Sequence, residues 1–331
     1  MNRREILLSA AALSACGPAE SQAPPPAPFP MRRGVNLGNA LEAPNEGDWG
    51  YRIEDAHLAA IADAGFDGVR LPVRWEPHMA ATAPHAIATG FLDRVEAIVT
   101  QALDRHLIVQ LDAHHYQDLL EHPEREQARF AMLWRQIAQH FRGAPPTLLF
   151  EPLNEPNGPV WTAPRVSAVE NVALAEIRTA STDRLVVFGG PNWNSIDGLV
   201  GWTPPADAKS AVTVHYYEPH AFTHQHAEWL GADAPHFDRD WGTPEDLHAV
   251  EAHAARAARW AAAHGLALQL GEFGANARVP LDQRARWTRT VRQAFENVGA
   301  GWCVWDFAGA FPIWDRQTRR FIPEMLDALI D

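Results

Sequence analysis

Short apolar segments alternate with amphipathic segments along the chain after Arg33. The apolar segments predict eight β-strands, at 34–39, 68–73, 107–113, 148–153, 185–190, 211–217, 267–272 and 301–306. Apolar residues at helical spacing predict helices between them, most clearly at 55–64, 91–105, 124–141, 165–180, 244–264 and 281–298. Strands that are joined by helical crossovers pair in parallel, so the pattern indicates an α/β fold.

The number of strand–helix units favours a closed barrel. Eight units in about 300 residues fit a single (β/α)8 TIM barrel better than an open, doubly wound sheet. No glycine-rich phosphate loop follows the first strand, which argues against a nucleotide-binding fold. We therefore expect residues 31–331 to form one barrel domain that carries the activity.

The first thirty residues differ from the rest. Residues 1–15 start with Arg3 and Arg4 and continue into an apolar run too short to span a bilayer, which predicts a signal peptide. The run ends in Leu-Ser-Ala-Cys at 13–16, which resembles a bacterial lipobox and implies cleavage before Cys16 and lipidation of its thiol. Residues 16–30 are rich in Pro and Ala and predict an extended tether.

These features predict export to the periplasm or the cell exterior as a membrane-anchored lipoprotein. Ordinary secretion with cleavage elsewhere is one alternative, and export through a twin-arginine signal is another. Cys303, the second of two cysteines, lies in an apolar strand and is expected to be a core residue, so a lipidated Cys16 leaves no disulfide.

The charge of the chain limits its partners. A net charge of −13 argues against nucleic acid or anionic lipid, because both need basic surfaces. We expect a monomer that meets a membrane only through its lipid anchor. The 13 tryptophans suit stacking on the apolar faces of sugar rings, but they also suit a core.

Polar and aromatic side chains gather where the predicted strands end. In α/β barrels, the chemistry lies at the C-terminal ends of the strands. Polar groups are costly to bury there without a partner or a ligand. They are Asn39, Arg70, Asp112, His114, His115, Asn154, Glu155, Asn192, His215, Tyr217, Glu272, Trp305 and Asp306.

Two of these residues form a candidate catalytic pair. Glu155 follows the fourth strand in Leu-Asn-Glu-Pro, and Glu272 ends the seventh in Gly-Glu-Phe-Gly. Glycoside hydrolysis needs two carboxyl groups that flank the scissile bond, about 5 Å apart in a retaining enzyme. A nucleophile must be ionised, and a guanidinium such as Arg70 and a hydroxyl such as Tyr217 would lower its pKa. His215 lies two residues before Tyr217, so both should face the same side of the strand.

The residues named above and the motifs around them resemble those of glycoside hydrolase family 5, the cellulase family of clan A. The resemblance covers almost the whole chain after residue 32 and is closest to bacterial endo-β-1,4-glucanases that often also cleave β-mannans. It rests on seven ordered motifs, which are RGVNLGNALEAPNEGDWG at 33–50, GVRLPVRW at 68–75, LDAHHYQDL at 111–119, LNEP at 153–156, HYYEPHAFTHQHAEW at 215–229, GEFG at 271–274 and VWDF at 304–307.

The resemblance implies a role for each matching residue. Glu155 is the acid/base and Glu272 the nucleophile, and the reaction retains the anomeric configuration. Asn154 binds the sugar 2-hydroxyl and Trp305 stacks under the sugar before the cleavage point. The residues implied to support the pair are Arg70 and Tyr217, which steady Glu272, and His114 and His215, which orient Glu155. Further sugar contacts are implied for Asn39, Glu42 and His115.

The resemblance implies no metal and no cofactor. Asp306 stands where many relatives carry Glu, which puts a hydroxyl contact there in doubt. The spacing of His220, His224 and His226 could suggest a metal, but no carboxylate or cysteine completes a set nearby, so we interpret them as solvated or sugar-contacting. His114 and His115 are adjacent and should point to opposite faces, and Glu151, below the strand end, is expected to be a buried structural carboxylate.

The leading hypothesis is therefore endo-acting, retaining hydrolysis of β-1,4-glucan, with a β-linked polysaccharide or oligosaccharide as substrate. Endo-hydrolysis of β-mannan or glucomannan is the alternative within the same class, since mannose differs by an axial 2-hydroxyl. A non-catalytic carbohydrate-binding lipoprotein and a metal-dependent barrel hydrolase are alternatives from other classes.

Overall fold

The computed structural model describes residues 27–331. The predicted signal peptide at 1–15, Cys16 and most of the predicted tether lie outside the described residues. Within the described range, no helix is long and apolar enough to cross a membrane.

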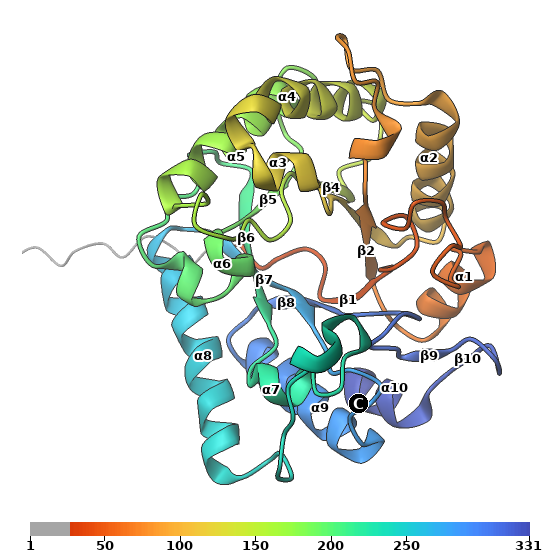
Figure 1. Ribbon diagram of the computed structural model, residues 1–331, viewed down its shortest axis with the longest axis vertical. Coiled ribbons are helices and arrows are strands. Elements are labelled where there is room, and N and C mark those ends of the chain that lie inside the picture. The colour runs from red at the N-terminus through yellow and green to blue at the C-terminus, as the bar shows by residue number, and fades with distance from the viewer. Residues whose placement is uncertain (1–26) are drawn as a thin grey trace, which may run out of the picture.

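Eight parallel strands close into a barrel in the order of the sequence, and helices surround it (Figure 1). The strands are β1 (Arg33–Asn36), β2 (Gly68–Val73), β3 (Ile108–Ala113), β4 (Leu148–Glu151), β5 (Val186–Gly189), β6 (Ser210–Tyr216), β7 (Ala267–Phe273) and β8 (Gly301–Val304). The barrel and the order of its strands confirm the predicted (β/α)8 fold.

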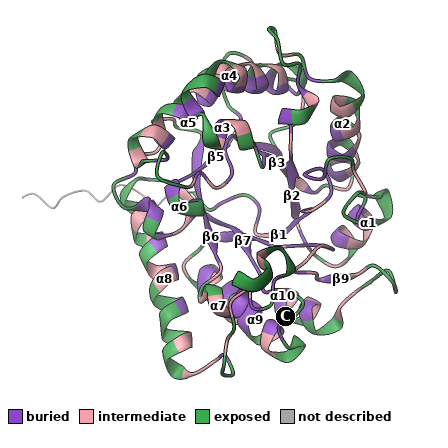
Figure 2. Ribbon diagram, viewed as in Figure 1, coloured by how far each residue is buried: buried purple, intermediate pink, exposed green. Residues whose placement is uncertain are grey.

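All six predicted helices are present, with ends within two residues of the expected ones. They are α1 (Asp55–Asp63), α2 (Thr89–Leu103), α4 (Pro123–His140), α5 (Ala163–Arg178), α8 (Pro244–Ala263) and α9 (Leu281–Asn297). Their buried faces pack on the strands, which are themselves buried on both sides (Figure 2).

Several elements were not predicted because they are short. They are α3 (Gln117–Glu121), α6 (Pro191–Asn194), α7 (His220–Thr223), α10 (Pro323–Ile330), the hairpin β9 (Trp314–Asp315) and β10 (Arg320–Phe321), and the 3-10 turns η1 (Glu76–His78), η2 (Asp197–Leu199) and η3 (Glu228–Asp233). The connection from β5 to β6 contains no long helix, and in α6 Asn192 and Trp193 have left-handed backbone angles.

Five strands end earlier than predicted, because the chain leaves the ladder before the polar residues of the mouth. They are β1, β4, β5, β6 and β8, which end at Asn36, Glu151, Gly189, Tyr216 and Val304. Glu155, four residues past β4, has a left-handed backbone with φ 46°. Such a conformation is uncommon outside glycine and occurs often at active sites.

The opposite end of the barrel is plugged by the start of the described chain. Phe29 and Met31 are buried and pack with Leu149, Val187 and Cys303, which lie within β4, β5 and β8. A Cβ on Gly301 would meet the backbone of Met31, so glycine is required for this close approach. Phe29 falls within the predicted 16–30 tether, so that boundary is corrected: the folded domain begins before residue 30.

Candidate active site

The guanidinium of Arg70 is the centre of a hydrogen-bonded network in the barrel mouth. Arg70, on β2, is fully buried and holds both carboxylate oxygens of Glu151 at 2.6 and 2.8 Å. It also donates to Glu272 Oε1 at 2.8 Å and to Asn154 Oδ1 at 2.7 Å. A buried charge is tolerated only when it is paired and hydrogen-bonded. Glu151, itself fully buried, is thereby confirmed as a structural carboxylate.

Two donors fix the carboxylate of Glu272, one on each oxygen. Arg70 donates to Oε1, and the Tyr217 hydroxyl donates to Oε2 over 2.8 Å. Both predicted partners of Glu272 are therefore in place. A carboxylate held in this way keeps one orientation, as an attacking nucleophile requires.

Glu155 has a different environment. A quarter of its side chain is exposed, against 5% for Glu272, and its Oε1 lies 2.7 Å from Nδ1 of His215. The same Nδ1 lies 3.6 Å from Glu272 Oε2, so the imidazole sits between the two acids. His215 thus contacts Glu155 as predicted, and with Tyr217 it confirms that this face of β6 lines the mouth.

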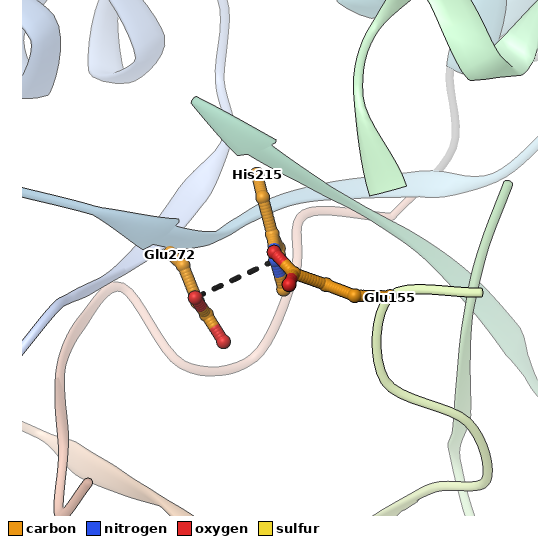
Figure 3. A group of neighbouring side chains, drawn as sticks. All are labelled: Glu155, His215 and Glu272. Carbon is orange, nitrogen blue, oxygen red and sulfur yellow. Dashed lines mark hydrogen bonds and ion pairs between the residues drawn. The ribbon is translucent and has the colours of Figure 1, made fainter. Parts of the chain in front are cut away.

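The two carboxylates lie as close together as a retaining glycosidase needs. One oxygen of Glu155, one of Glu272 and a ring nitrogen of His215 all lie within 4.8 Å of one another (Figure 3). Carboxyl groups in inverting enzymes stand about 6.5–9.5 Å apart, to leave room for a water, whereas those in retaining enzymes stand about 5–5.5 Å apart. The observed spacing fits attack by the carboxylate itself.

Burial raises the pKa of both acids to about 7. For Glu272, the nearby His215, Arg70 and Tyr217 oppose this effect, and the charge of Glu155 adds to it. Arg70 and Tyr217 lower the pKa of Glu272 as expected, but burial outweighs them and the net shift is upward. Since the two direct donors are on Glu272, we infer that it is the member of the pair that ionises first.

A second chain of contacts orients Asn154. Burial lowers the pKa of the His114 imidazole, and its Nδ1 lies 2.7 Å from Asp112 Oδ2. The Nε2 of His114 lies 3.4 Å from the amide nitrogen of Asn154, while Arg70 holds the amide oxygen. His114 was predicted to orient Glu155. Its contacts correct this, because it positions Asn154 instead.

The family model described as cellulase (glycosyl hydrolase family 5) matches residues 32–310. The chain belongs to glycoside hydrolase family 5. The match covers every predicted site residue from Asn39 to Trp305, and it confirms the resemblance seen in the sequence.

Similar proteins carry names that agree with this assignment. Endoglucanase H of Acetivibrio thermocellus is 35% identical over 92% of this chain, which spans about a third (34%) of that relative's length. The solved structure of Cel5A from Thermotoga maritima in complex with cellobiose is 37% identical and has a TM-score of 0.88, with 91% of this chain and 97% of that chain covered. Cel5A is also solved with a mannotriose substrate, at 36% identity, a TM-score of 0.88 and the same coverage.

Further residues of this family 5 site come from the loops after β1 and β8. Asn39 has a left-handed backbone, and its amide donates to the buried Asp306 in a short hydrogen bond. Asp306 also accepts from the backbone N–H groups of Gly309 and Phe311, so it holds the β8 loop. Burial raises the pKa of Asp306 to about 6.

Glu42 is almost completely buried. Its two oxygens accept from the backbone N–H groups of Asn39, at 2.7 Å, and Ala40, at 3.1 Å. Burial raises its pKa to about 8. The contacts show that Glu42 positions Asn39, and the sugar contact expected of Glu42 itself stays a prediction.

The Trp305 ring lies beside His114 in the barrel mouth. It is half-buried and stacks on the His114 ring at a centroid distance of 5.6 Å, nearly parallel at 8°. A Cβ on Gly38 would come within 2.7 Å of the Trp305 ring, so the ring requires glycine there. His115 is exposed and has a left-handed backbone, and its ring lies edge-on to His114 at 4.4 Å. The expectation that the two histidines point to opposite faces is wrong, because both lie beyond the end of β3.

The three spaced histidines of the loop after β6 do not all point to one place. His220 stacks on His224 at 4.0 Å, and His224 contacts the ring of Tyr217 at 5.1 Å. His226 turns away toward His236, a residue that the sequence pattern did not single out. The three spaced histidines are therefore not a common ligand set.

Two contacts at or beside the site were not foreseen from the sequence. Asp112 was noted only as a polar strand end, although it holds His114. Trp193 is an exposed tryptophan whose backbone N–H donates to the carbonyl of Pro156, next to Glu155. The count of tryptophans gave no way to select it, because exposure and the left-handed turn at 192–194 are tertiary features.

Proposed function

We propose that this family 5 protein is an endo-acting, retaining hydrolase of β-1,4-glucan. The single observation that carries the mechanism is the pair Glu155 and Glu272, with oxygens within 4.8 Å and with different hydrogen-bond partners. The relatives named endoglucanase support the substrate and the endo mode.

The first step forms a glycosyl-enzyme. A carboxylate oxygen of Glu272 bonds to the anomeric carbon while the glycosidic C–O bond breaks. Glu155 gives its proton to the departing oxygen, so the aglycone leaves as an alcohol. A pKa of about 7 keeps Glu155 protonated through much of the acidic to neutral range.

The second step reverses the roles. Once Glu272 is esterified it carries no negative charge, so the pKa of Glu155 falls and its carboxylate accepts a proton from water. The oxygen of that water displaces Glu272, which leaves ionised, stabilised by Arg70 and Tyr217. Two inversions give net retention, and both residues return to their starting states.

Asn154 and His215 support these steps. The amide oxygen of Asn154 is held by Arg70, which leaves its nitrogen to donate toward the sugar 2-hydroxyl. Burial lowers the pKa of His215 to about 4, so its imidazole is neutral and adds no competing charge beside Glu155.

The mechanism is tested with Glu272→Ala. We expect turnover to fall by several orders of magnitude, because the covalent route is lost. Glu251→Ala, an exposed glutamate on α8, is the matched control and should behave as the unmodified enzyme. Unchanged hydrolysis by Glu272→Ala would remove the assignment, and an inactive unmodified protein that still binds glucan would favour the non-catalytic alternative.

The substrate is tested by a side-by-side product profile on barley β-glucan, carboxymethyl cellulose, glucomannan and mannan. We expect reducing ends to appear from soluble β-glucan together with a fall in viscosity. Release of monosaccharide at constant viscosity would reject the endo mode. Faster cleavage of mannan would favour the β-mannanase alternative, which the mannotriose complex of the Thermotoga maritima relative makes worth testing.

We further propose that the protein is exported and anchored through a lipid on Cys16. Phe29 and Met31 enter the barrel at the end opposite the mouth, so a tether from Cys16 would reach the domain from behind and leave the mouth facing away from the membrane. Mass spectrometry of the mature N-terminus and release of Cys16→Ala into the soluble fraction would test this. An unmodified, soluble wild-type protein would overturn it.

A further inference from the structure

The loop between β6 and α8 brings the rings of two exposed histidines close together, tilted by 57°. The Nδ1 atom of His236 lies 3.3 Å from the Nε2 atom of His226, with ring centroids 5.0 Å apart. The backbone N–H of His226 donates to the carbonyl of Pro235 at 3.2 Å. This bond joins the two ends of the 226–236 segment directly beside the imidazoles and fixes their approach.

The distance between the two nitrogens suits a shared metal ion. Zn²⁺ binds histidine nitrogen at about 2.0–2.1 Å in tetrahedral geometry, which places two ligand nitrogens ~3.3 Å apart. Both side chains are exposed, so an ion has access and water can complete its coordination.

The carboxylate of Asp238 fixes the position of the proton on the His236 ring. The Nε2 atom of His236 lies 2.9 Å from Asp238 Oδ1, so the ring proton is held on that side. The Nδ1 lone pair of His236 then faces His226. Metal-binding histidines in proteins commonly donate their second N–H to a carboxylate in this way.

We propose that His226 and His236 form a binding site for a divalent transition metal of the class that prefers imidazole, such as Zn²⁺, Cu²⁺ or Ni²⁺. The site is separate from Glu155, His215 and Glu272, and its ion takes no part in hydrolysis. With only two protein ligands its affinity is modest, and Cu²⁺ binds most tightly of the three.

Metal binding at this site would link the two ends of the 226–236 segment, which carries Trp229. Trp229 is exposed and packs against His224 and Phe311, and His224 in turn packs on Tyr217. An ion joining His226 to His236 binds the folded loop and not the unfolded chain, so it stabilises the loop. The expected consequence is a metal-dependent rise in melting temperature.

The test is titration of the metal-free full chain, purified without a histidine tag, with Zn²⁺ at neutral pH. We expect one Zn²⁺ per chain in the unmodified protein, and at least tenfold weaker binding in His226→Ala and in His236→Ala. Asp238→Asn should weaken binding about tenfold, as loss of a carboxylate behind a metal-binding histidine does. His220→Ala, an exposed histidine on the same loop, should bind as the unmodified protein.

Two results would overturn the proposal. One is the absence of a stoichiometric site in the unmodified protein. The other is binding that survives His226→Ala but is lost in Glu272→Gln, which would place the ion at Glu155, His215 and Glu272 instead, the group of acids and histidine whose ligand atoms are close enough for a metal. Melting curves of each variant without metal serve to show that it is folded.

Discussion

The Tyr217 hydroxyl donates to Glu272 Oε2 over 2.8 Å, from the residue just past the end of β6. The contact depends on a local irregularity, because the pairing of β6 with β7 shifts register between Val214 and His215 and sets His215 opposite Glu272. The shift places the His215 imidazole and the Tyr217 phenol beside the two carboxylates of Glu155 and Glu272.

Replacing Tyr217 by phenylalanine removes one of the two donors on Glu272. We expect kcat to fall roughly 10²-fold, the usual effect of losing one preorganised donor. The acidic limb of the kcat/KM profile should move to higher pH, because the remaining environment favours protonated Glu272. Steady-state kinetics across pH on soluble β-glucan measures both. Tyr216→Phe, whose hydroxyl bonds His253, is the matched control, and equal effects of the two variants would argue against a specific role.

Glu155→Ala should separate the two chemical steps. Substrates with good leaving groups need no proton, so they should still form the glycosyl-enzyme and then stall for lack of a base. Added azide should restore turnover and give a β-glycosyl azide, identified by NMR. An α-azide product would contradict retention.

The stability of the protein should fall as the pH rises from about 5 to 8. Burial raises the pKa of Glu42 to about 8, so the folded chain holds a proton that the unfolded chain loses above its ordinary pKa of 4.5. Stability from such a group is complete below 4.5 and is lost as the pH rises through 8, at up to about 1.4 kcal/mol per pH unit. Glu42→Gln carries no titrating proton there, so its melting temperature should depend less on pH than that of the unmodified protein. Parallel melting curves from pH 5 to 9 check this, and identical slopes would refute it.

Phe29→Ala should destabilise the barrel while leaving the mouth intact. Phe29 is 1% exposed among strand residues, and truncation of a buried phenylalanine costs about 3–5 kcal/mol. Denaturant unfolding measures the loss, and kcat at low temperature should be unchanged. The neighbouring Pro30 is exposed, so the Pro30→Ala variant serves as the control. Full stability of Phe29→Ala would show that the plug contributes nothing.

Much of the fold was readable in the sequence, because each helix and strand carries its own period of apolar residues. The six long helices and all eight strands follow from that local pattern, and the motifs around Glu155 and Glu272 identify the acids. Local pattern also explains the errors: strands appeared to continue into the mouth, since a change to left-handed backbone at Glu155 leaves no trace in hydrophobicity.

The tertiary structure alone decided how distant residues meet. That His114 holds Asn154 and that burial raises the pKa of Glu272 depend on contacts between segments far apart in the chain. The pairing of His226 with His236 also depends on tertiary structure, because the loop folds back to bring the two residues together. No spacing in the sequence predicts this contact. Sequence periodicity reports which face of an element is buried, whereas solvation and pairing of charges depend on what closes over that face.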